Sequence, residues 1–336
     1  MTITAPPLTG RTHGVRGGPG RLRMAVCLAT IAACVPYLTL KAAWLSGSTI
    51  GWNDADAAGE SGLYTANAIT MGLDAMAVVV VLAFTFRWGM RIPAWLVLAP
   101  IWIATGLLTP IVLAVPLGSV LQVLFSSEPL TTSDNAIQGW VYGVVYTGFT
   151  LQALGLVTAF VLYARNRWAD VFTMRTRDVP KGTTHQVHVL LAYAAGVLAA
   201  LFAAVQLFWA LGATAGLTAA QVDHRTAVQQ LADGTGGLLA LAGAAALVLI
   251  VRRDGRRLVV PLAVAWTGAA ATFADSLYAL LVTVSRPALL ASESTAALNL
   301  TALCGVFAGL LMGIAGVLLL AETDAQRARP TASSAP

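Results

Sequence analysis

Eight long apolar stretches dominate the chain and restrict the folds that are open to it. They cover residues 24–45, 63–86, 94–115, 139–164, 187–211, 231–251, 258–284 and 297–321. A helix needs about 20 mostly apolar residues to cross a bilayer, and each stretch is long enough. The apolar residues run continuously and do not alternate with period two, which argues against a transmembrane β-barrel. The sequence therefore predicts an all-α integral membrane protein with eight transmembrane helices.

The charge content supports this class. Only 10% of the 336 residues are charged, whereas a soluble domain carries about 25%. So few charges cannot cover the surface of a soluble protein, and the apolar content excludes a disordered chain. The three cysteines lie inside apolar stretches, which is not the pattern of a disulfide scaffold.

The distribution of charge predicts the orientation of the spans. If the N-terminus lies inside and every span crosses, 17 of the 20 basic residues fall on the inner side. The net charge then divides into +12 inside, −5 outside and −2 within the membrane. Basic residues accumulate on the cytoplasmic side of membrane proteins. We therefore expect a bacterial plasma membrane protein with both termini in the cytoplasm.

The same reasoning gives a division of the chain. Residues 21–165 and 187–325 form two halves of four spans each, joined by a basic cytoplasmic linker at 166–186. Residues 1–20 and 326–336 are expected to be disordered cytoplasmic tails.

A short motif indicates that the two halves are a tandem repeat. Trp44, Gly47, Thr49 and Gly51 recur 165 residues later as Trp209, Gly212, Thr214 and Gly216. Arg87 and Arg91, after the second span, match Arg252 and Arg256 at the same offset. Since each half holds an even number of spans, the repeats would be parallel, related by an axis along the membrane normal. Chance similarity between Ala- and Leu-rich helices is the alternative explanation.

Four ionisable residues lie within the expected spans, namely Lys41, Asp74, Asp233 and Asp275. A charge at bilayer depth costs about 2.5–3.5 kcal/mol on insertion scales, so each is a candidate for function. All four fall at the middle or in the outer half, which predicts an outward-facing acidic and aromatic cavity. Asp74 and Asp275 are the candidate catalytic residues. The expected cavity lining is Tyr37, Lys41, Trp44, Glu60, Asn67, Thr70, Tyr142, Tyr146, Gln206, Trp209, Asp233, Thr272 and Tyr278.

Each ionisable residue also has a purely structural interpretation. Lys41 can extend its side chain to the outer surface, or pair with Asp74 on the next helix. Asp275 can be satisfied by hydrogen bonds from Thr272 and Tyr278. Asp233 can cap a helix or lie at the membrane interface.

Three classes of function remain open. No metal, nucleotide or other cofactor motif is present, and the basic residues are too dispersed for nucleic-acid binding. We favour a membrane-embedded enzyme that acts on a lipid-soluble, isoprenoid-like substrate by carboxylic-acid general acid catalysis. Its general design is similar to that of the bacterial membrane-embedded terpene cyclases, with no shared motif. The alternatives are a proton- or cation-coupled transporter of a small solute and a non-catalytic membrane subunit. The oligomeric state stays open, and the expected partners are the bilayer and a lipid-soluble molecule or small solute.

Overall fold

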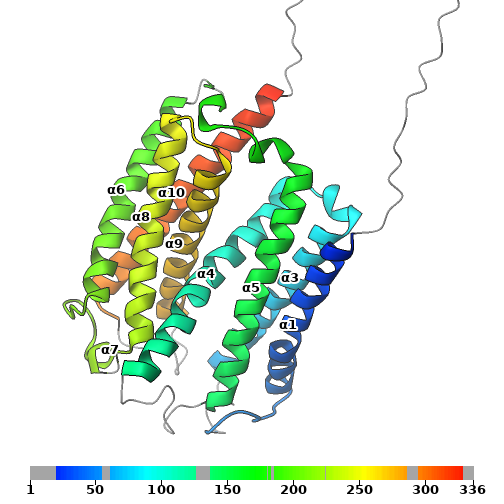
Figure 1. The fold of residues 1–336 in the computed structure, drawn as a ribbon. Coiled ribbons are helices and arrows are strands. Elements are labelled where there is room, and N and C mark those ends of the chain that lie inside the picture. The colour runs from blue at the N-terminus through cyan, green and yellow to red at the C-terminus, as the bar shows by residue number, and fades with distance from the viewer. Residues whose placement is uncertain are drawn as a thin grey trace, which may run out of the picture.

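The computed structural model describes residues 20–54, 61–125, 137–179, 181–182, 185–223, 225–285 and 294–327. These residues fold into nine α-helices and three short 3₁₀-helices, and the long helices run side by side as one bundle (Figure 1). The α-helices are α1 (Arg21–Leu45), α3 (Ser61–Thr85), α4 (Ala94–Phe125), α5 (Gly139–Arg167), α6 (His185–Ala210), α7 (Ala219–Asp223), α8 (Ala227–Arg252), α9 (Val259–Ser285) and α10 (Ala296–Arg327). The 3₁₀-helices are η1 (Arg87–Met90), η2 (Ala169–Phe172) and η3 (Thr176–Asp178).

Seven of the described helices are long and apolar enough to cross a membrane. The protein is therefore a polytopic integral membrane protein, as the sequence predicts. The seven are α1, α3, α4, α5, α6, α8 and α10. The remaining expected span, at 258–284, is the 27-residue helix α9, which carries Asp275 together with hydroxyl-bearing residues that lower its hydropathy.

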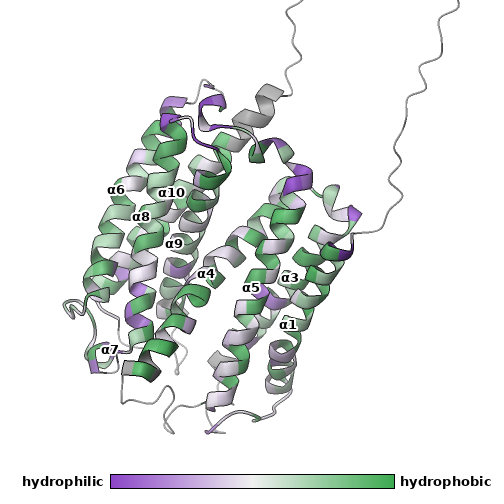
Figure 2. Ribbon diagram, viewed as in Figure 1, coloured by the Kyte–Doolittle hydropathy of each residue, from purple (hydrophilic) through white to green (hydrophobic). Residues whose placement is uncertain are grey.

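The outer surface of the bundle matches a lipid environment. Large apolar side chains are exposed along the helices, including Leu190 at 68%, Trp95 at 67% and Val317 at 66% of their surface. Figure 2 shows the hydrophilic residues concentrated at the two ends of the helices, with a few between them. A soluble monomer rarely exposes so large a continuous apolar surface.

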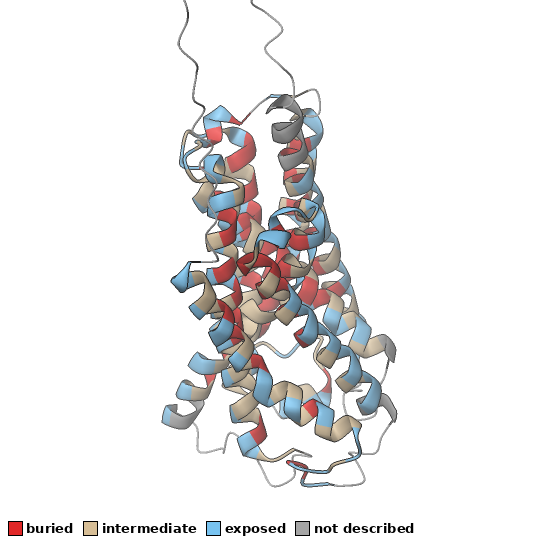
Figure 3. Ribbon diagram, turned by 90° about the vertical axis from the view of Figure 1, so that its right-hand side faces the viewer, coloured by how far each residue is buried: buried red, intermediate tan, exposed pale blue. Residues whose placement is uncertain are grey.

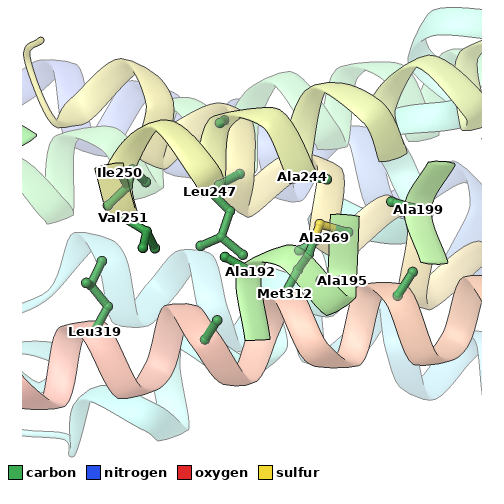
Figure 4. Packing of buried hydrophobic residues seen from close by; sticks show 14 of the residues in the cluster. Ala192, Ala195, Ala199, Ala244, Leu247, Ile250, Val251, Ala269, Met312 and Leu319 are labelled. Atoms are coloured by element: carbon green, nitrogen blue, oxygen red, sulfur yellow. The ribbon is translucent and has the colours of Figure 1, made fainter. Parts of the chain in front are cut away.

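Small residues allow the helices of the second half to pack closely. A cluster of buried alanines lies where α6, α8, α9 and α10 meet, and Leu247, Ile250, Met312 and Leu319 fill the space around it (Figures 3 and 4). Between α8 and α9, a Cβ atom on Gly243 would lie 2.9 Å from the Cα atom of Gly268. Small residues of this kind let membrane helices approach at van der Waals distance.

Helix α4 joins the two halves. It runs obliquely between the group α1, α3, α5 and the group α6, α8, α9, α10 (Figure 1). Its contacts with α8 and α9 are more extensive than those with α3. Trp102 of α4 stacks on Phe273 of α9 with ring centroids 5.2 Å apart, and Trp266 of α9 stacks on Phe160 of α5 at 6.0 Å.

The segment after α5 is hydrogen-bonded to the loop between α8 and α9 at one end of the bundle. Thr176 of η3 is fully buried and accepts a hydrogen bond from the Gly255 N–H at 2.8 Å. Its hydroxyl donates to Asp254 Oδ1 at 3.0 Å, and its backbone N–H donates to the Arg256 carbonyl at 2.8 Å. The linker is thus held against the α8–α9 loop through backbone and side-chain hydrogen bonds.

Candidate functional site

The candidate residues separate into two polar regions, one in each half. The first lies between α1, α3 and α5 and comprises Tyr37, Lys41, Thr70, Asp74 and Gln152, which we call the Lys41 cluster. The second is a cavity of about 230 Å³ among α6, α7, α8, α9 and α10. The sequence analysis assigns its candidates to a single cavity, whereas the structure places Lys41 and Asp74 in the first region and Asp233 and Asp275 in the second.

Lys41 is the centre of the first region. Its side chain is only 1% exposed, so it does not extend to the surface. The ammonium group donates a hydrogen bond to Thr70 Oγ1 on α3. It also lies 4.4 Å from the centroid of the Tyr37 ring, one turn earlier on α1, which is within the range of a cation–π interaction.

Asp74 lies one turn beyond Thr70 on α3 and is 5% exposed. Its Oδ1 accepts a hydrogen bond of 3.4 Å from Gln152 Nε2 on α5. Its Oδ2 is buried and has no hydrogen-bond partner within the described chain. Asp74 and Lys41 interact electrostatically, but they form no ion pair within 4 Å. Each charge therefore has a neutral hydrogen-bond partner, Thr70 for Lys41 and Gln152 for Asp74, and the two charged groups are not in direct contact.

The cavity of the second half is lined mainly by polar residues. Its lining consists of Phe202, Gln206, Trp209, Leu217, Gln221, Arg225, Gln229, Asp233, Asp275, Ser276, Ala279, Leu298, Thr301 and Ala302. Gln221 belongs to α7, so the cavity lies toward the end of the bundle that carries α7 (Figure 1). That end is opposite to the start of α1 and the end of α10.

Two carboxylates face this cavity in different environments. Asp233 forms an ion pair with Arg225, and the Arg225 guanidinium also donates to the Trp209 carbonyl at 2.9 Å. Thr226 is the N-cap of α8, so Asp233 is an ion-pair partner and not the cap. Asp275 of α9 is exposed and lines the cavity.

Asp275 has no counter-ion in the part of the chain that the structure describes. Thr272 does not satisfy it, since its hydroxyl donates to the Gly268 carbonyl at 2.7 Å. Tyr278 is 52% exposed and makes no hydrogen bond to it. Next to it, Ser276 is 3% exposed and its Oγ has no partner among the described residues. Among the described residues, the cavity therefore presents the unpaired carboxylate of Asp275, whereas the Ser276 Oγ is buried beside Gly305 of α10.

The other expected lining residues lie outside the cavity. Trp44 donates its indole N–H to the Ile50 carbonyl at 2.7 Å, and Tyr142 stacks on Tyr146 along α5. The backbone carbonyl of Asn67 accepts a hydrogen bond from the Thr70 hydroxyl at 3.3 Å. Glu60 falls outside the described residues.

Several lining residues are not found by the sequence argument. Arg225, Gln221 and Gln229 lie outside the expected spans, and the structure places all three in the cavity lining, Gln221 from α7 and Gln229 from the first turn of α8. The available signal is Arg225, a basic residue on the expected outer side with an acidic residue eight positions later. Gln152 and Ser276 are polar residues within spans, so a search that included uncharged side chains would find both.

Comparisons with known proteins give no further information on this site, because no model of a protein family, no curated protein and no solved structure matches the chain.

Proposed function

We propose that eight helices span the membrane, with both termini in the cytoplasm and α9 as the eighth span. A helix of 27 residues is about 40 Å long, which exceeds the roughly 30 Å of a hydrocarbon core. The start of α1 and the end of α10 lie at the same end of the bundle (Figure 1), and this arrangement requires an even number of crossings. The inner end would carry the linker and the Arg-rich loop after α8.

We further propose that the two halves are parallel repeats, and the turns after α1 and α6 support this. Gly47 and Gly212 have φ of 91° and 95°, and Gly51 and Gly216 have φ of 82° and 85°. In both turns the tryptophan at the helix end donates its indole N–H to the carbonyl six residues later. Such a turn needs glycine at both left-handed positions. The shared Trp, Gly, Thr and Gly pattern therefore encodes the same backbone path twice.

The cavity supports the binding of a small organic cation. Its described charged groups are Arg225, Asp233 and Asp275, which sum to one negative charge. A monovalent cation beside Asp275 would neutralise it, and Phe202 and Trp209 offer aromatic faces for cation–π contact. A volume of about 230 Å³ lies below the roughly 300–1,000 Å³ of pockets for drug-sized ligands. This size and polarity favour a small solute over an isoprenoid chain.

From these properties we infer that the protein is a proton- or cation-coupled carrier of a small organic cation. The free carboxylate of Asp275 is the observation that carries this proposal. Carboxylates carried by membrane-spanning helices at a binding site are a common means of coupling solute movement to an ion gradient.

Uptake into proteoliposomes tests the proposal, with choline and n-butylammonium as probes under an imposed proton or sodium gradient. We expect gradient-dependent uptake by the wild type and its loss in Asp275→Asn. Asp223→Asn is the matched control, because Asp223 ends α7, is exposed and does not line the cavity. Absence of uptake of both cations under both gradients would refute the carrier function.

A membrane-embedded enzyme is the second candidate, supported by the unpartnered oxygen of Asp74 and by the free carboxylate of Asp275. A carboxylic acid without a counter-ion can act as a general acid. Here Asp74→Asn or Asp275→Asn would abolish conversion of a lipid-phase isoprenoid alcohol, with geranylgeraniol as the probe. Unchanged conversion in both variants would exclude this chemistry.

A further inference from the structure

We propose that the Lys41 cluster is an occupied copy of the cavity. In the first half, the ammonium group of Lys41 occupies a cation position within the protein. In the second half, a ligand with a primary ammonium group would occupy the equivalent position in the cavity. This inference rests on the proposed cation site and on the proposed repeat, and it specifies the ligand as a short primary alkylammonium ion.

The turns after α1 and α6 fix the register in which the residues of the two halves correspond. At the offset of 165 residues, Tyr37, Lys41 and Trp44 of α1 correspond to Phe202, Gln206 and Trp209 of α6. All three residues of α6 line the cavity. The same face of α1 carries Lys41 into the protein interior. The position that is lysine in the first half is thus glutamine, with a shorter and uncharged side chain, beside the cavity.

The partners of Lys41 also have counterparts in the second half. Thr70, which accepts the hydrogen bond from Lys41, corresponds to Thr235 on α8. A Cβ atom on the neighbouring Gly236 would lie 3.5 Å from Gln206 Nε2, so this part of α8 contacts the side chain that replaces Lys41. The aromatic ring one turn before Lys41 is retained as Phe202.

Each ammonium position faces a carboxylate, although the two carboxylates come from different helices. Asp74 of α3 interacts electrostatically with Lys41. In the second half the residue equivalent to Asp74 is Leu239, and Asp275 of α9 supplies the charge instead. The difference follows from the helix packing, because α9 lies against α8 whereas α4 contacts α3 less and leans toward the second half.

The ligand class follows from what Lys41 provides to its own site. The lysine side chain presents a primary ammonium on a chain of four methylene groups, and n-butylammonium is that side chain as a free ion. In the cavity its N–H groups would donate to the Asp275 carboxylate and to the Gln206 amide oxygen, since both residues line the cavity. Its apolar stem would lie against Phe202.

A variant that carries an ammonium group on its own side chain in the cavity tests this inference. The purified protein in detergent micelles is titrated with n-butylammonium chloride against equal concentrations of KCl, and thermal unfolding is followed. We expect Gln206→Lys to raise the unfolding midpoint without ligand and to weaken n-butylammonium binding by about tenfold or more, as expected when a charged hydrogen-bonding site is already filled. Gln206→Met is the uncharged control and should not raise the midpoint. In the double variant Gln206→Lys/Asp275→Asn, the increase in the thermal unfolding midpoint should disappear.

The converse variant should open the first site. Lys41→Gln reproduces the residue of the second half, and calorimetric titration should then detect a second bound n-butylammonium ion per chain. If this variant fails to fold, the Gln206→Lys comparison decides the matter by itself. Equal effects of Gln206→Lys and Gln206→Met, or unchanged binding in Gln206→Lys, would overturn the inference. Binding of choline without n-butylammonium would overturn it and leave the cation site standing, whereas binding of neither cation would remove both proposals.

Discussion

At the scale of single residues, the pair of buried charges in the Lys41 cluster is the feature most sensitive to change. Lys41 and Asp74 are 1% and 5% exposed, and each is held by one uncharged partner. Removing one member of a buried pair of charges leaves the other uncompensated, at a cost of about 3–5 kcal/mol for a direct ion pair. We expect Asp74→Leu and Lys41→Met each to destabilise the protein by about 2–4 kcal/mol, somewhat less because Thr70 and Gln152 remain.

The double variant separates charge from packing. If the loss comes from an uncompensated charge, Lys41→Met/Asp74→Leu should be more stable than the sum of the single variants predicts, by about 1–3 kcal/mol. The free energy of unfolding in mixed detergent micelles provides the measurement. Strict additivity would show that the two charges do not compensate each other.

The sequence identifies this pair because a charge in an apolar stretch is conspicuous, and helical spacing places Thr70 and Asp74 on one face. It cannot show which alternative holds for Lys41. The Lys41 side chain could reach the surface, pair with Asp74 or bond to Thr70. Which of these occurs depends only on how α1 lies against α3. Tertiary packing decides this, as it also decides the separation of Asp74 from Asp275.

At the scale of elements, the turns after α1 and α6 have the same backbone path but different burial. Trp209 is 4% exposed and its indole lies next to the cavity, whereas the indole bond of Trp44 lies at an exposed position. Trp209→Phe removes a part-buried hydrogen bond to the Ala215 carbonyl and leaves a cavity where a buried ring was, whereas Trp44→Phe removes an exposed bond whose acceptor can turn to water. We expect Trp209→Phe to lower the free energy of unfolding by about 1–3 kcal/mol and Trp44→Phe to lower it by less than about 1 kcal/mol. Equal losses would show that burial does not distinguish the turns.

The crossing of α4 and α9 is the element contact that holds the halves together. A Cβ atom on Gly106 of α4 would overlap the carbonyl group of Ala270 on α9. Gly106→Val should therefore separate the helices and cost about 1–3 kcal/mol, the usual range for overpacking. Gly143→Val on α5 is the control, because nothing lies within 4 Å of a Cβ atom there. Thermal unfolding in micelles compares the two, and an equal loss would point to helix propensity instead of the crossing.

The sequence predicts the helices far better than their arrangement. Seven of the eight apolar stretches coincide with described spanning helices, and the eighth with α9, because a lipid-facing helix is apolar all round and easily recognised. The same uniformity removes the amphipathic pattern that would reveal its neighbours. The position of α4 against α8 and α9 depends on Gly106 and on the stacked pair Trp102 and Phe273, whose partners are far apart in the sequence.

At the scale of the whole molecule, the orientation of α9 decides between seven and eight crossings. With eight crossings, Arg257 before α9 and Ser294 after it must lie on opposite sides of the membrane. Arg257 should be cytoplasmic and Ser294 external, together with Ser48 after α1.

Single-cysteine variants test this topology in intact cells. Cys27, Cys34 and Cys304 are the native cysteines, and they are first replaced by alanine. A membrane-impermeant maleimide should then label Ser48→Cys and Ser294→Cys from outside, and Arg257→Cys only after the membrane is opened. Arg257 and Ser294 are exposed in the bundle and Ser48 is half-buried, so at the two positions that flank α9 a failure to label reflects the side of the membrane and not burial. External labelling of both Arg257→Cys and Ser294→Cys would mean that α9 does not cross. In that case the free carboxylate of Asp275 would not face a cavity within the bilayer, and the energetic argument for its function would no longer hold.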